Sequence, residues 1–513
     1  MASLIVVAVL LPVTYLIIRA VGAGGDAWEG LLRFQTFETI ARTAWLSTAV
    51  TLASALIAVP LAWLTVRTDL PLRRMWAVLT PLPLVIPSYV GAYLFASAFG
   101  PRGLLQQLLE SLFKVTRLPE IYGFPGAMLV LTLLSYPYIL IGTRAALIKI
   151  DPGLEEASRS LGYGAWGTFW RVTLPLLRPA LGSGCLLVAL YVLRDFGAVA
   201  IMRYSTFTRT IYASYTSFDR SQAALLSLVL VAITLFFLAL ETRTLSRAQY
   251  FQSGTGKTRP PTLVHLGYWR WPALFFCGAV VFVSLILPAG LLTYWLVRGL
   301  VAGEVIPTLG LAAWNSVTAS GLGALATLLA ALPVAILIVR RPGRMTRWLH
   351  RLAYSTFALP GIVIALALVF FGANHAPLLY QTLPMLLLAY GILFLPQAIG
   401  AVRASLLQIH PNLEEAARSL GRHPIQVFFD ITFPLLRSGL VAGASLVFLT
   451  IMKELPATLI LAPIGFKTLA TGVWSAVSEA FFAQAAFPAL LIVLMSSLPM
   501  TFFILNEQSV EPS

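Results

Sequence analysis

Residues Leu352–Val402 read LAYSTFALPGIVIALALVFFGANHAPLLYQTLPMLLLAYGILFLPQAIGAV, a run without Asp, Glu, Lys or Arg. An α-helix needs roughly 20 apolar residues to cross the hydrocarbon core of a bilayer, so this run is too long for a single crossing. Gly372, Asn374 and Pro377 interrupt it near its middle. The run therefore predicts two membrane-spanning helices that are joined by a short turn.

The composition of the whole chain also indicates a lipid environment. Of the 513 residues, 58% are hydrophobic and 11% are charged, and the mean hydropathy is +0.85. Soluble domains contain about 25% charged residues, and folding hides at most roughly three quarters of their surface, so a soluble globular protein is excluded. Disordered chains are polar and poor in aromatic residues, which excludes disorder. The two cysteines, Cys185 and Cys277, exclude a disulfide scaffold and a cysteine-built metal site.

Twelve segments are apolar and long enough to span a membrane. We therefore predict an all-α integral membrane protein with about 12 transmembrane helices and with both termini in the cytoplasm. In this orientation most Lys and Arg residues fall in cytoplasmic loops, as the positive-inside rule requires. The net charge of +15 then reflects topology and contact with anionic lipid, and no nucleic-acid partner is expected. The predicted spans lie near residues 1–20, 43–66, 76–99, 122–142, 180–202, 221–240, 272–296, 313–338, 353–372, 383–402, 439–461 and 482–505.

The chain contains an internal repeat. The stretch DPGLEEASRSLG, from Asp151 to Gly162, returns as HPNLEEAARSLG, from His410 to Gly421. The same offset pairs many other residues, and a slightly longer offset continues the match upstream. The residues paired in this way include Arg194-Asp195 with Lys453-Glu454, Pro87 with Pro360, and Arg67 with Arg340.

The repeat predicts two six-helix halves, residues 1–241 and residues 271–513, joined by a cytoplasmic linker at residues 242–270. An even number of spans gives both halves the same orientation, so we expect two parallel repeats related by a pseudo-two-fold axis along the membrane normal. The first half carries extra residues in the outside loop after Gly100.

Each copy of the repeated stretch is expected to fold as two short helices in the cytoplasm. Each begins with a proline that suits a first helical turn and holds a glycine placed to end the first helix in a left-handed conformation. The second helix should stop ahead of the next proline. These residues are Pro152, Gly162 and Pro175 in the first copy, and Pro411, Gly421 and Pro434 in the second.

At these residues the chain resembles the EAA loop of binding-protein-dependent ABC importer permeases. The pattern of that loop is Glu-Ala-Ala, three residues, Gly, nine residues, Ile, any residue and Leu-Pro. Both copies keep the spacing, with conservative departures at Ser158, Val172 and Phe433. The resemblance covers essentially the whole chain, as a fused pair of six-helix permeases. The residues that it assigns to ATPase coupling are Glu155, Glu156, Ala157, Gly162, Glu414, Glu415, Ala416 and Gly421.

The resemblance implies a transport subunit rather than an enzyme. In this family the loop is a coupling helix seated in a groove of a cytoplasmic ATPase, so two copies imply a homodimeric ABC ATPase that uses ATP and Mg. This chain is expected to bind no cofactor, because the P-loop-like residues 253–258 are followed by Pro260 and Pro261 instead of a helix. An amphipathic loop resting on lipid is the alternative interpretation of the repeated stretch.

Two pairs of charged residues fall inside predicted spans, Arg194-Asp195 and Lys453-Glu454. A charge at mid-membrane costs about 2.5–3.5 kcal/mol on insertion scales, so these groups should face protein or water. Pairing between the two halves is geometrically attractive. One hypothesis is that these residues line or gate the transport path, and the other is that they form a structural ion pair. The sequence leaves both hypotheses open.

The sequence carries no cluster of metal ligands, so no metal site is predicted. By resemblance the chain is most similar to the iron(III) branch of the fused permeases, in which a periplasmic or lipoprotein binding protein delivers the cargo at the bacterial inner membrane. The segments that carry this resemblance begin at Pro87, Phe99 and Arg194. Importers of thiamine, polyamines or phosphonates share the architecture, and an ion-coupled secondary transporter is a rival class.

Overall fold

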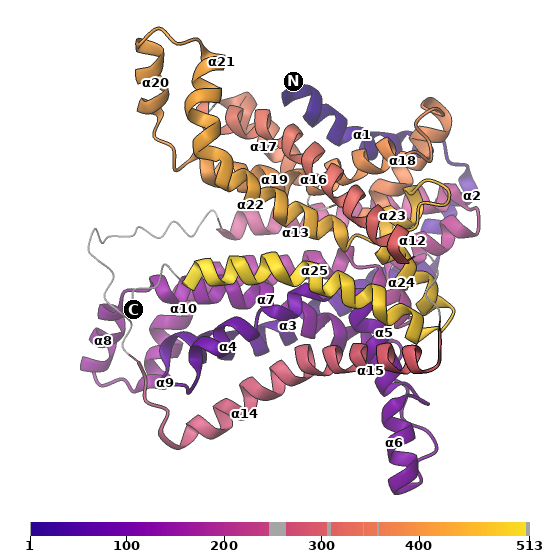
Figure 1. Ribbon diagram of the computed structural model, residues 1–513, viewed down its shortest axis with the longest axis vertical. Helices are drawn as coiled ribbons and strands as arrows, with labels where there is room; N and C mark the ends of the chain where they lie inside the picture. Colours follow the sequence, from indigo (N-terminus) through magenta and orange to yellow (C-terminus); the bar gives the residue numbers. More distant parts are fainter. Residues whose placement is uncertain (1, 246–262, 305–308, 342, 357–358, 509–513) are drawn as a thin grey trace. The chain divides into compact units, whose positions relative to one another are not determined.

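The computed structural model describes residues 2–245, 263–304, 309–341, 343–356 and 359–508 (Figure 1). These residues form helices and short connections, with one isolated β-bridge between Thr68 and Val264, so the predicted all-α class is confirmed. Most of the predicted linker at residues 242–270, including the P-loop-like residues 253–258, lies outside the described residues.

Within the described ranges, eight helices are long and apolar enough to cross a membrane, and a bent pair of helices makes a ninth candidate. Three further predicted spans coincide with shorter apolar segments, which are Val9–Val21 in α1 (Ala2–Val21), the whole of α18 (Gly361–His375) and Phe482–Ser497 in α25 (Phe482–Gln508). The count is therefore consistent with about 12 spans. The eight are α3 (Phe34–Arg67), α7 (Phe124–Lys149), α10 (Leu174–Arg194), α13 (Arg220–Leu245), α14 to α15 (Arg270–Val301), α16 (Leu309–Arg340), α19 (Leu383–Leu406) and α22 (Phe433–Met452).

The third predicted span, residues 76–99, is broken rather than continuous. The helical segments on either side of the break meet at 95°. Prolines at positions 81, 83 and 87 explain the break, because proline donates no backbone hydrogen bond and disfavours helical geometry in the residue before it. The pieces are α4 (Arg73–Leu79), the short 3₁₀ helix η1 (Leu82–Val85) and α5 (Ser88–Phe99).

The chain forms two compact units, and each draws segments from both sequence repeats. Unit 1 comprises Met1–Leu32, Ile211–Val231 and Ile306–Ser475, and unit 2 comprises Arg33–Thr210, Ala232–Val305 and Ala476–Ser513. These units divide the chain differently from the predicted halves at residues 1–241 and 271–513. The predicted halves describe the sequence repeat and stay a prediction for the structure.

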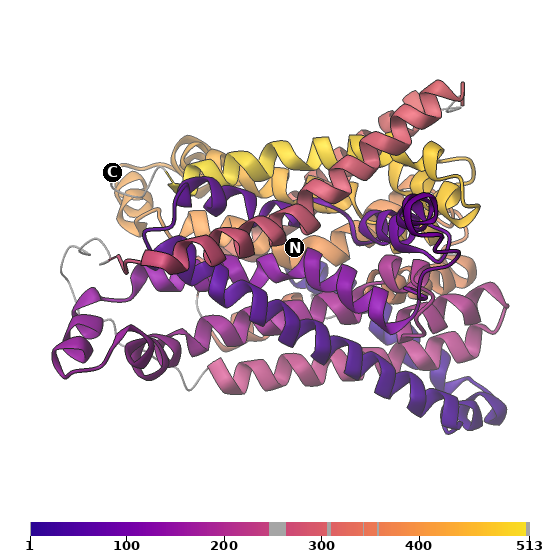
Figure 2. The same ribbon diagram turned by 90° about the horizontal axis from the view of Figure 1, so that it is seen from below.

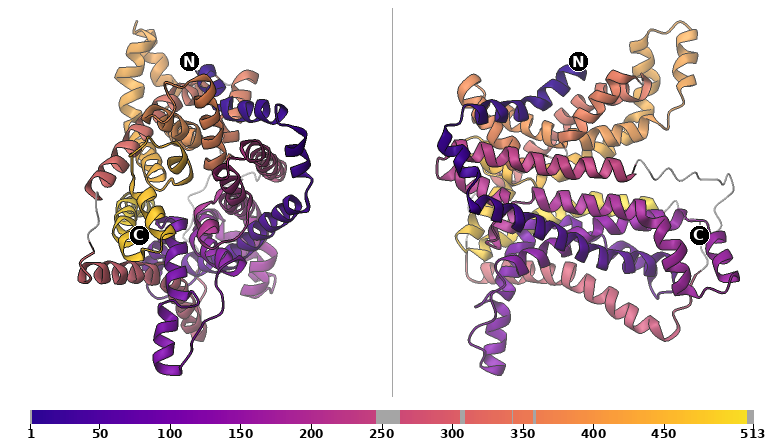
Figure 3. Two further views of the ribbon diagram at one scale, coloured as in Figure 1. Left: turned by 90° about the vertical axis from the view of Figure 1, so that its right-hand side faces the viewer. Right: turned by 180° about the vertical axis from the view of Figure 1, so that it is seen from behind.

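The core of unit 1 is a group of three long helices, α16, α19 and α22, which pack against one another (Figure 3). Small residues such as Ser320 and Gly323 let the α16 backbone approach its neighbours closely, as is typical of membrane helices. Helix α1 packs on α16, α18 and the short helix α17 (Arg344–Ser355).

The core of unit 2 is built from the corresponding three helices of the first repeat, α3, α7 and α10. Helix α5 packs on α7, and α15 packs on α5 and α25. Figure 2 shows α14 (Arg270–Val281) and α15 (Leu287–Val301) as one long, bent rod, joined by the π-helical turn η4 (Phe282–Ile286). The same three-helix core therefore occurs twice, once in each unit.

Candidate functional site

The repeated stretch folds as a short helix pair in each unit, and we call these pairs the coupling elements. The first consists of α8 (Pro152–Ser160) and α9 (Ala165–Thr168), and the second of α20 (Pro411–Ser419) and α21 (Pro424–Val427). In Figure 1, α20 lies beside α21, which continues into α22.

The local chemistry of the sequence sets the ends of the first helix in each element. Asp151 accepts a hydrogen bond from the Gly153 N–H at 3.0 Å, and the His410 Nδ1 accepts one from the Asn412 N–H at 3.3 Å. These contacts satisfy free N–H groups of the first turn. Both helices then end at a glycine in the left-handed conformation, as the sequence predicted. The φ angles of these glycines are +88° at Gly162 and +83° at Gly421.

The second helix of each element does not stop ahead of the next proline, which corrects the sequence prediction. It passes through a π-helical turn, η2 (Phe169–Thr173) or η6 (Phe428–Thr432), and continues into α10 or α22. A proline normally clashes with the carbonyl four residues earlier. The carbonyls that would clash with Pro175 and Pro434 lie inside the π turns, whose wider winding moves them aside.

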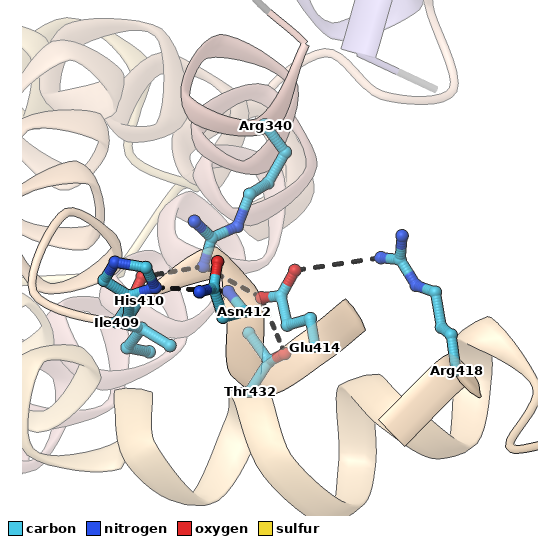
Figure 4. A network of polar contacts seen from close by, with 7 residues as sticks. All are labelled: Arg340, Ile409, His410, Asn412, Glu414, Arg418 and Thr432. Atoms are coloured by element: carbon cyan, nitrogen blue, oxygen red, sulfur yellow. Dashed lines mark hydrogen bonds and ion pairs between the residues drawn. The ribbon is translucent and has the colours of Figure 1, made fainter. Parts of the chain in front are cut away.

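A buried carboxylate joins the second coupling element to its unit (Figure 4). The Arg340 Nη2 lies 2.9 Å from the Glu414 Oε1, and the Thr432 hydroxyl donates to the same oxygen at 3.0 Å. Arg340 also donates to the Ile409 carbonyl at 3.3 Å. The Arg418 Nη2 lies 3.8 Å from the other oxygen of Glu414. One carboxylate therefore links the end of α16, the helix α20 and the π turn η6.

The first coupling element repeats this arrangement. The Arg67 guanidinium lies 3.6 Å from the Glu155 Oε1 and donates to the Leu147 and Ile150 carbonyls at 3.0 Å and 3.2 Å. The Thr173 hydroxyl donates to the same Glu155 oxygen at 2.9 Å. Arg67 is only 1% exposed, so its charge depends on these internal partners. We call each arginine, glutamate and threonine set a brace.

The sequence assigned all four glutamates of the repeats to ATPase coupling, and the structure places them in two different environments. Glu155 and Glu414 are buried in the braces, at 5% and 7% exposure, whereas Glu156 and Glu415 are exposed. Sequence reasoning did not identify the arginine and threonine partners. The repeat itself carried the signal, because the offset upstream of the repeated stretch already pairs Arg67 with Arg340.

Each coupling element also exposes large apolar side chains. In the first element, Leu161 is 77% and Trp166 is 75% exposed, and in the second Leu420 is 84% and Ile425 is 72% exposed. Exposed apolar groups gathered on a short element are typical of a surface that contacts another protein or lipid. We call these side chains, together with Trp170 in η2 and Phe429 in η6, the apolar patch; its members within the coupling elements are Leu154, Leu161 and Trp166 in the first and Leu413, Leu420 and Ile425 in the second.

The intramembrane charges lie where two helices break. The predicted span at residues 180–202 ends at Arg194, and a new short helix, α11 (Gly197–Ile201), follows. The Asp195 carboxylate accepts a hydrogen bond from the Ala198 N–H at 2.9 Å. In unit 1, α22 ends at Met452 and the Glu454 carboxylate accepts from the Ala457 N–H at 3.3 Å, at the start of α23 (Pro456–Leu461). Both carboxylates therefore accept a hydrogen bond from a first-turn N–H of the short helix that follows the break.

These acidic side chains face protein. Asp195 is 8% exposed, and Glu454 lines a cavity of about 10 Å³ together with Ser320, Tyr390 and Thr458. Gly361 lies against Glu454, because a Cβ at that position would come within 2.5 Å of the Glu454 Oε1. The predicted pairing between Arg194-Asp195 and Lys453-Glu454 joins residues of the two different units, and it stays a prediction.

Among the described residues, no group of three or more His, Cys, Asp and Glu side chains is placed to hold a metal ion. The fold and the two coupling elements thus define a helical membrane protein with a duplicated core, in which each core carries a braced helix pair at its end. The chain belongs to the family described as binding-protein-dependent transport system inner membrane component, which matches residues 58–302 and again residues 321–512. It is the membrane permease of an ABC importer, a transport protein and not an enzyme.

Two relatives match most of the chain, and a third matches part of it. The chain is 37% identical over 95% of its length to "Fe(3+)-transport system permease protein FbpB 2" of Haemophilus influenzae, of which it covers 94%. It is 24% identical over 90% of its length to "Ferric transport system permease protein FbpB" of Actinobacillus pleuropneumoniae, of which it covers 70%. A shorter relative, "Molybdenum transport system permease protein ModB" of Escherichia coli, is 34% identical over 34% of this chain and 79% of its own length.

Proposed function

We propose that this permease passes iron(III), delivered by an external binding protein, across the inner membrane while its two coupling elements dock on two ATPase subunits. The cargo follows from the similarity to an Fe(3+)-transport permease, which is 37% identical over 95% of the chain. The alternative cargoes are thiamine, polyamines and phosphonates.

The observation that carries the docking is the construction of the coupling elements. Each presents an apolar patch on a short helix pair that a brace fixes to the end of a long membrane helix. A rigid element wedged against a moving body passes the motion on, whereas a flexible loop absorbs it. Closure of the ATPase dimer would therefore tilt α3 and α10 through the first element, and α16 and α22 through the second.

The proposal also includes the other partners of the permease and its orientation in the membrane. The coupling elements face the cytoplasm, as do both termini, and the two halves are related by a pseudo-two-fold axis along the membrane normal. ATP and Mg are used by a homodimeric ATPase, and this chain binds no cofactor of its own. A periplasmic or lipoprotein binding protein supplies the cargo on the other side.

Reconstitution in proteoliposomes tests the proposal. The permease, its ATPase and its binding protein are expected to accumulate iron(III) only when ATP is present on the ATPase side. Uptake of thiamine, a polyamine or a phosphonate instead of iron(III) would replace the cargo and keep the importer. Uptake that follows an ion gradient without any ATPase would contradict the proposal and favour a secondary transporter.

A further inference from the structure

Unit 2 contains a cavity of about 670 Å³ at the end of α7 that lies away from the coupling element. Helix α7 has 26 residues and so is about 39 Å long. The last turn of α7 is followed closely by α8 of the first coupling element. Tyr122, which lines the cavity, lies just before the first turn of α7, so the cavity and the coupling element are at opposite ends of this helix. The cavity is lined by Ala96, Ser97, Gly100, Pro101, Arg102, Gly103, Arg117, Tyr122, Arg203 and Phe482.

Three of these lining residues are arginines and none is acidic. Arg203 lies over the Tyr122 ring, with its guanidinium carbon 5.0 Å from the ring centroid. Arg117 is 3.8 Å from Glu120, but both side chains are about two thirds exposed, so that pair offsets little of the charge. Burial and, to a smaller extent, the charge of Arg203 lower the pKa of the nearby Arg209. The cavity therefore carries an excess of positive charge.

The backbone holds Arg203 in an unfavourable conformation at this cavity. Its φ angle is +56°, in the left-handed region that non-glycine residues rarely adopt. Hydrogen bonds on both sides fix it, from the Gly123 N–H to the Met202 carbonyl at 2.6 Å and from the Tyr204 N–H to the Val199 carbonyl at 2.9 Å. The second of these bonds is typical of a helix C-terminal cap, so the end of α11 holds the Arg203 backbone at the edge of the cavity.

The other two arginines come from a closed hairpin around α6 (Leu104–Phe113), which contains the extra residues of the first repeat. The Gln106 side chain donates to the Val115 carbonyl at 2.9 Å, and the Leu118 N–H donates to the Pro101 carbonyl at 3.1 Å. These bonds bring the two ends of the hairpin together and so place Arg102 and Arg117 on one cavity. The second repeat lacks the extra residues.

When the coupling elements face the cytoplasm, the cavity lies on the external side of the membrane. The positive-inside rule disfavours arginine on that side, so the presence of three arginines at one cavity requires an explanation. Guanidinium groups form paired, charge-assisted hydrogen bonds with carboxylate and phosphate oxygens. We propose that the cavity binds a small oxyanion that carries two or more negative charges. Such a group belongs either to a soluble external anion or to the headgroup of an anionic lipid, and the chemistry of recognition is the same.

The site has a consequence for the cargo, and this consequence rests on the proposed iron function. Three guanidinium groups repel a bare trivalent cation but attract one that is wrapped in carboxylate or phosphate ligands. The permease would then receive iron(III) as an oxyanion complex at this cavity.

The test is equilibrium binding of radiolabelled citrate and inorganic phosphate to the purified permease in phosphatidylcholine nanodiscs. At least one probe is expected to bind with one site per chain. The variants Arg102→Gln, Arg117→Gln and Arg203→Gln should each weaken that binding about 10-fold or more, since a hydrogen bond to a charged group contributes about 1.5–3 kcal/mol. Arg33→Gln is the matched control, because Arg33 is exposed, precedes α3 at the end away from Arg67 and does not line the cavity.

A second set of nanodiscs that contain phosphatidylglycerol separates the two sources. Unchanged probe binding there supports a soluble anion, and loss of probe binding only there supports a lipid headgroup in the same site. Absence of binding, or binding that the triple arginine variant retains, would overturn the site. Iron uptake is measured separately, so failure of the iron function with arginine-dependent binding intact would leave the site standing.

Discussion

At the scale of single residues, neighbouring glutamates in the coupling elements have different environments. Successive helix positions are about 100° apart, so Glu155 faces the brace while Glu156 faces outward, and the same holds for Glu414 and Glu415. The sequence motif does not distinguish these four glutamates, and only the structure shows which of them are buried and which are exposed. The arginine and threonine partners of the buried glutamates come from other parts of the chain, which is why sequence spacing alone did not reveal them.

The braces predict that substitution of the buried glutamates lowers the stability of the permease, whereas substitution of the exposed glutamates weakens its association with the ATPase. Glu155→Gln together with Glu414→Gln removes the countercharge of Arg67, Arg340 and Arg418, of which Arg67 is buried, and a broken buried ion pair costs about 3–5 kcal/mol. We expect a lower melting temperature in thermal unfolding and weak coupling between ATP hydrolysis and uptake. Unchanged stability would contradict the brace.

The matched control is Glu156→Gln together with Glu415→Gln. These exposed side chains hold no brace, so stability should change by less than about 0.5 kcal/mol. Weaker association with the ATPase is expected instead, and pull-down of the ATPase measures it.

A second residue-scale prediction concerns Gly361, which leaves room for the Glu454 carboxylate. Gly361→Ala places a Cβ 2.5 Å from the Glu454 Oε1, so this oxygen must move away and release the Ala457 N–H, and a buried donor without its partner costs about 1–3 kcal/mol. Thermal unfolding should show the loss. Gly391→Ala is the control within unit 1, because nothing lies within 4 Å of its Cβ position, and it should leave the stability equal or higher. Equal melting temperatures for the two variants would contradict the contact.

At the scale of elements, apolar length and the glycine positions predicted most helices and the turns of the coupling elements. The sequence did not reveal the break in the third span, the π turns or the helix restarts after Arg194 and Met452. The chemistry of proline explains the break and the π turns once the backbone is known, but residue spacing does not indicate how a helix accommodates Pro175. At each restart a carboxylate accepts a first-turn N–H of the next short helix, and hydropathy counts that carboxylate only as unfavourable for membrane insertion.

The π turn sets the rotation of each coupling element relative to its long helix. Deletion of Phe429, which is exposed, in a Pro434→Ala background that removes the proline clash should convert η6 to α-helical winding and rotate α20 and α21 by about 100° relative to α22. This rotation separates Thr432 from Glu414 and turns the apolar patch away. We expect an inserted, folded permease that no longer stimulates its ATPase, as measured by ATP hydrolysis in nanodiscs. Phe429→Ala, which keeps the turn, should retain at least part of the stimulation, and equal activity of both variants would contradict the role of the turn.

At the two helix restarts, we expect stability to depend more on the side-chain oxygen that accepts the backbone N–H than on the negative charge of the carboxylate. Asp195→Asn and Glu454→Gln keep an oxygen that accepts the Ala198 or Ala457 N–H, so stability should fall by less than about 1 kcal/mol. Asp195→Leu and Glu454→Leu leave that N–H without its partner and should cost about 1–3 kcal/mol in thermal unfolding. Equal losses in the amide and leucine variants would show that the charge itself is needed.

At the scale of the whole molecule, composition and the repeat predicted a helical membrane protein, and the family match in both halves confirms the permease class. The repeat could not predict the compact units, because it records ancestry along the chain and not which helices pack together. Each unit contains one three-helix core and one coupling element. We therefore expect two equivalent docking points for the ATPase.

The most direct test of this expectation changes the two glycines that end α8 and α20. Leucine is strained at φ angles of +88° and +83°, whereas asparagine tolerates them, so Gly162→Leu with Gly421→Leu should displace both apolar patches and Gly162→Asn with Gly421→Asn should not. Native mass spectrometry of the permease with its ATPase measures the outcome. We expect two ATPase subunits per chain for the parent and the asparagine variant and none for the leucine variant, whereas full ATPase binding by a folded leucine variant would contradict docking at the coupling elements.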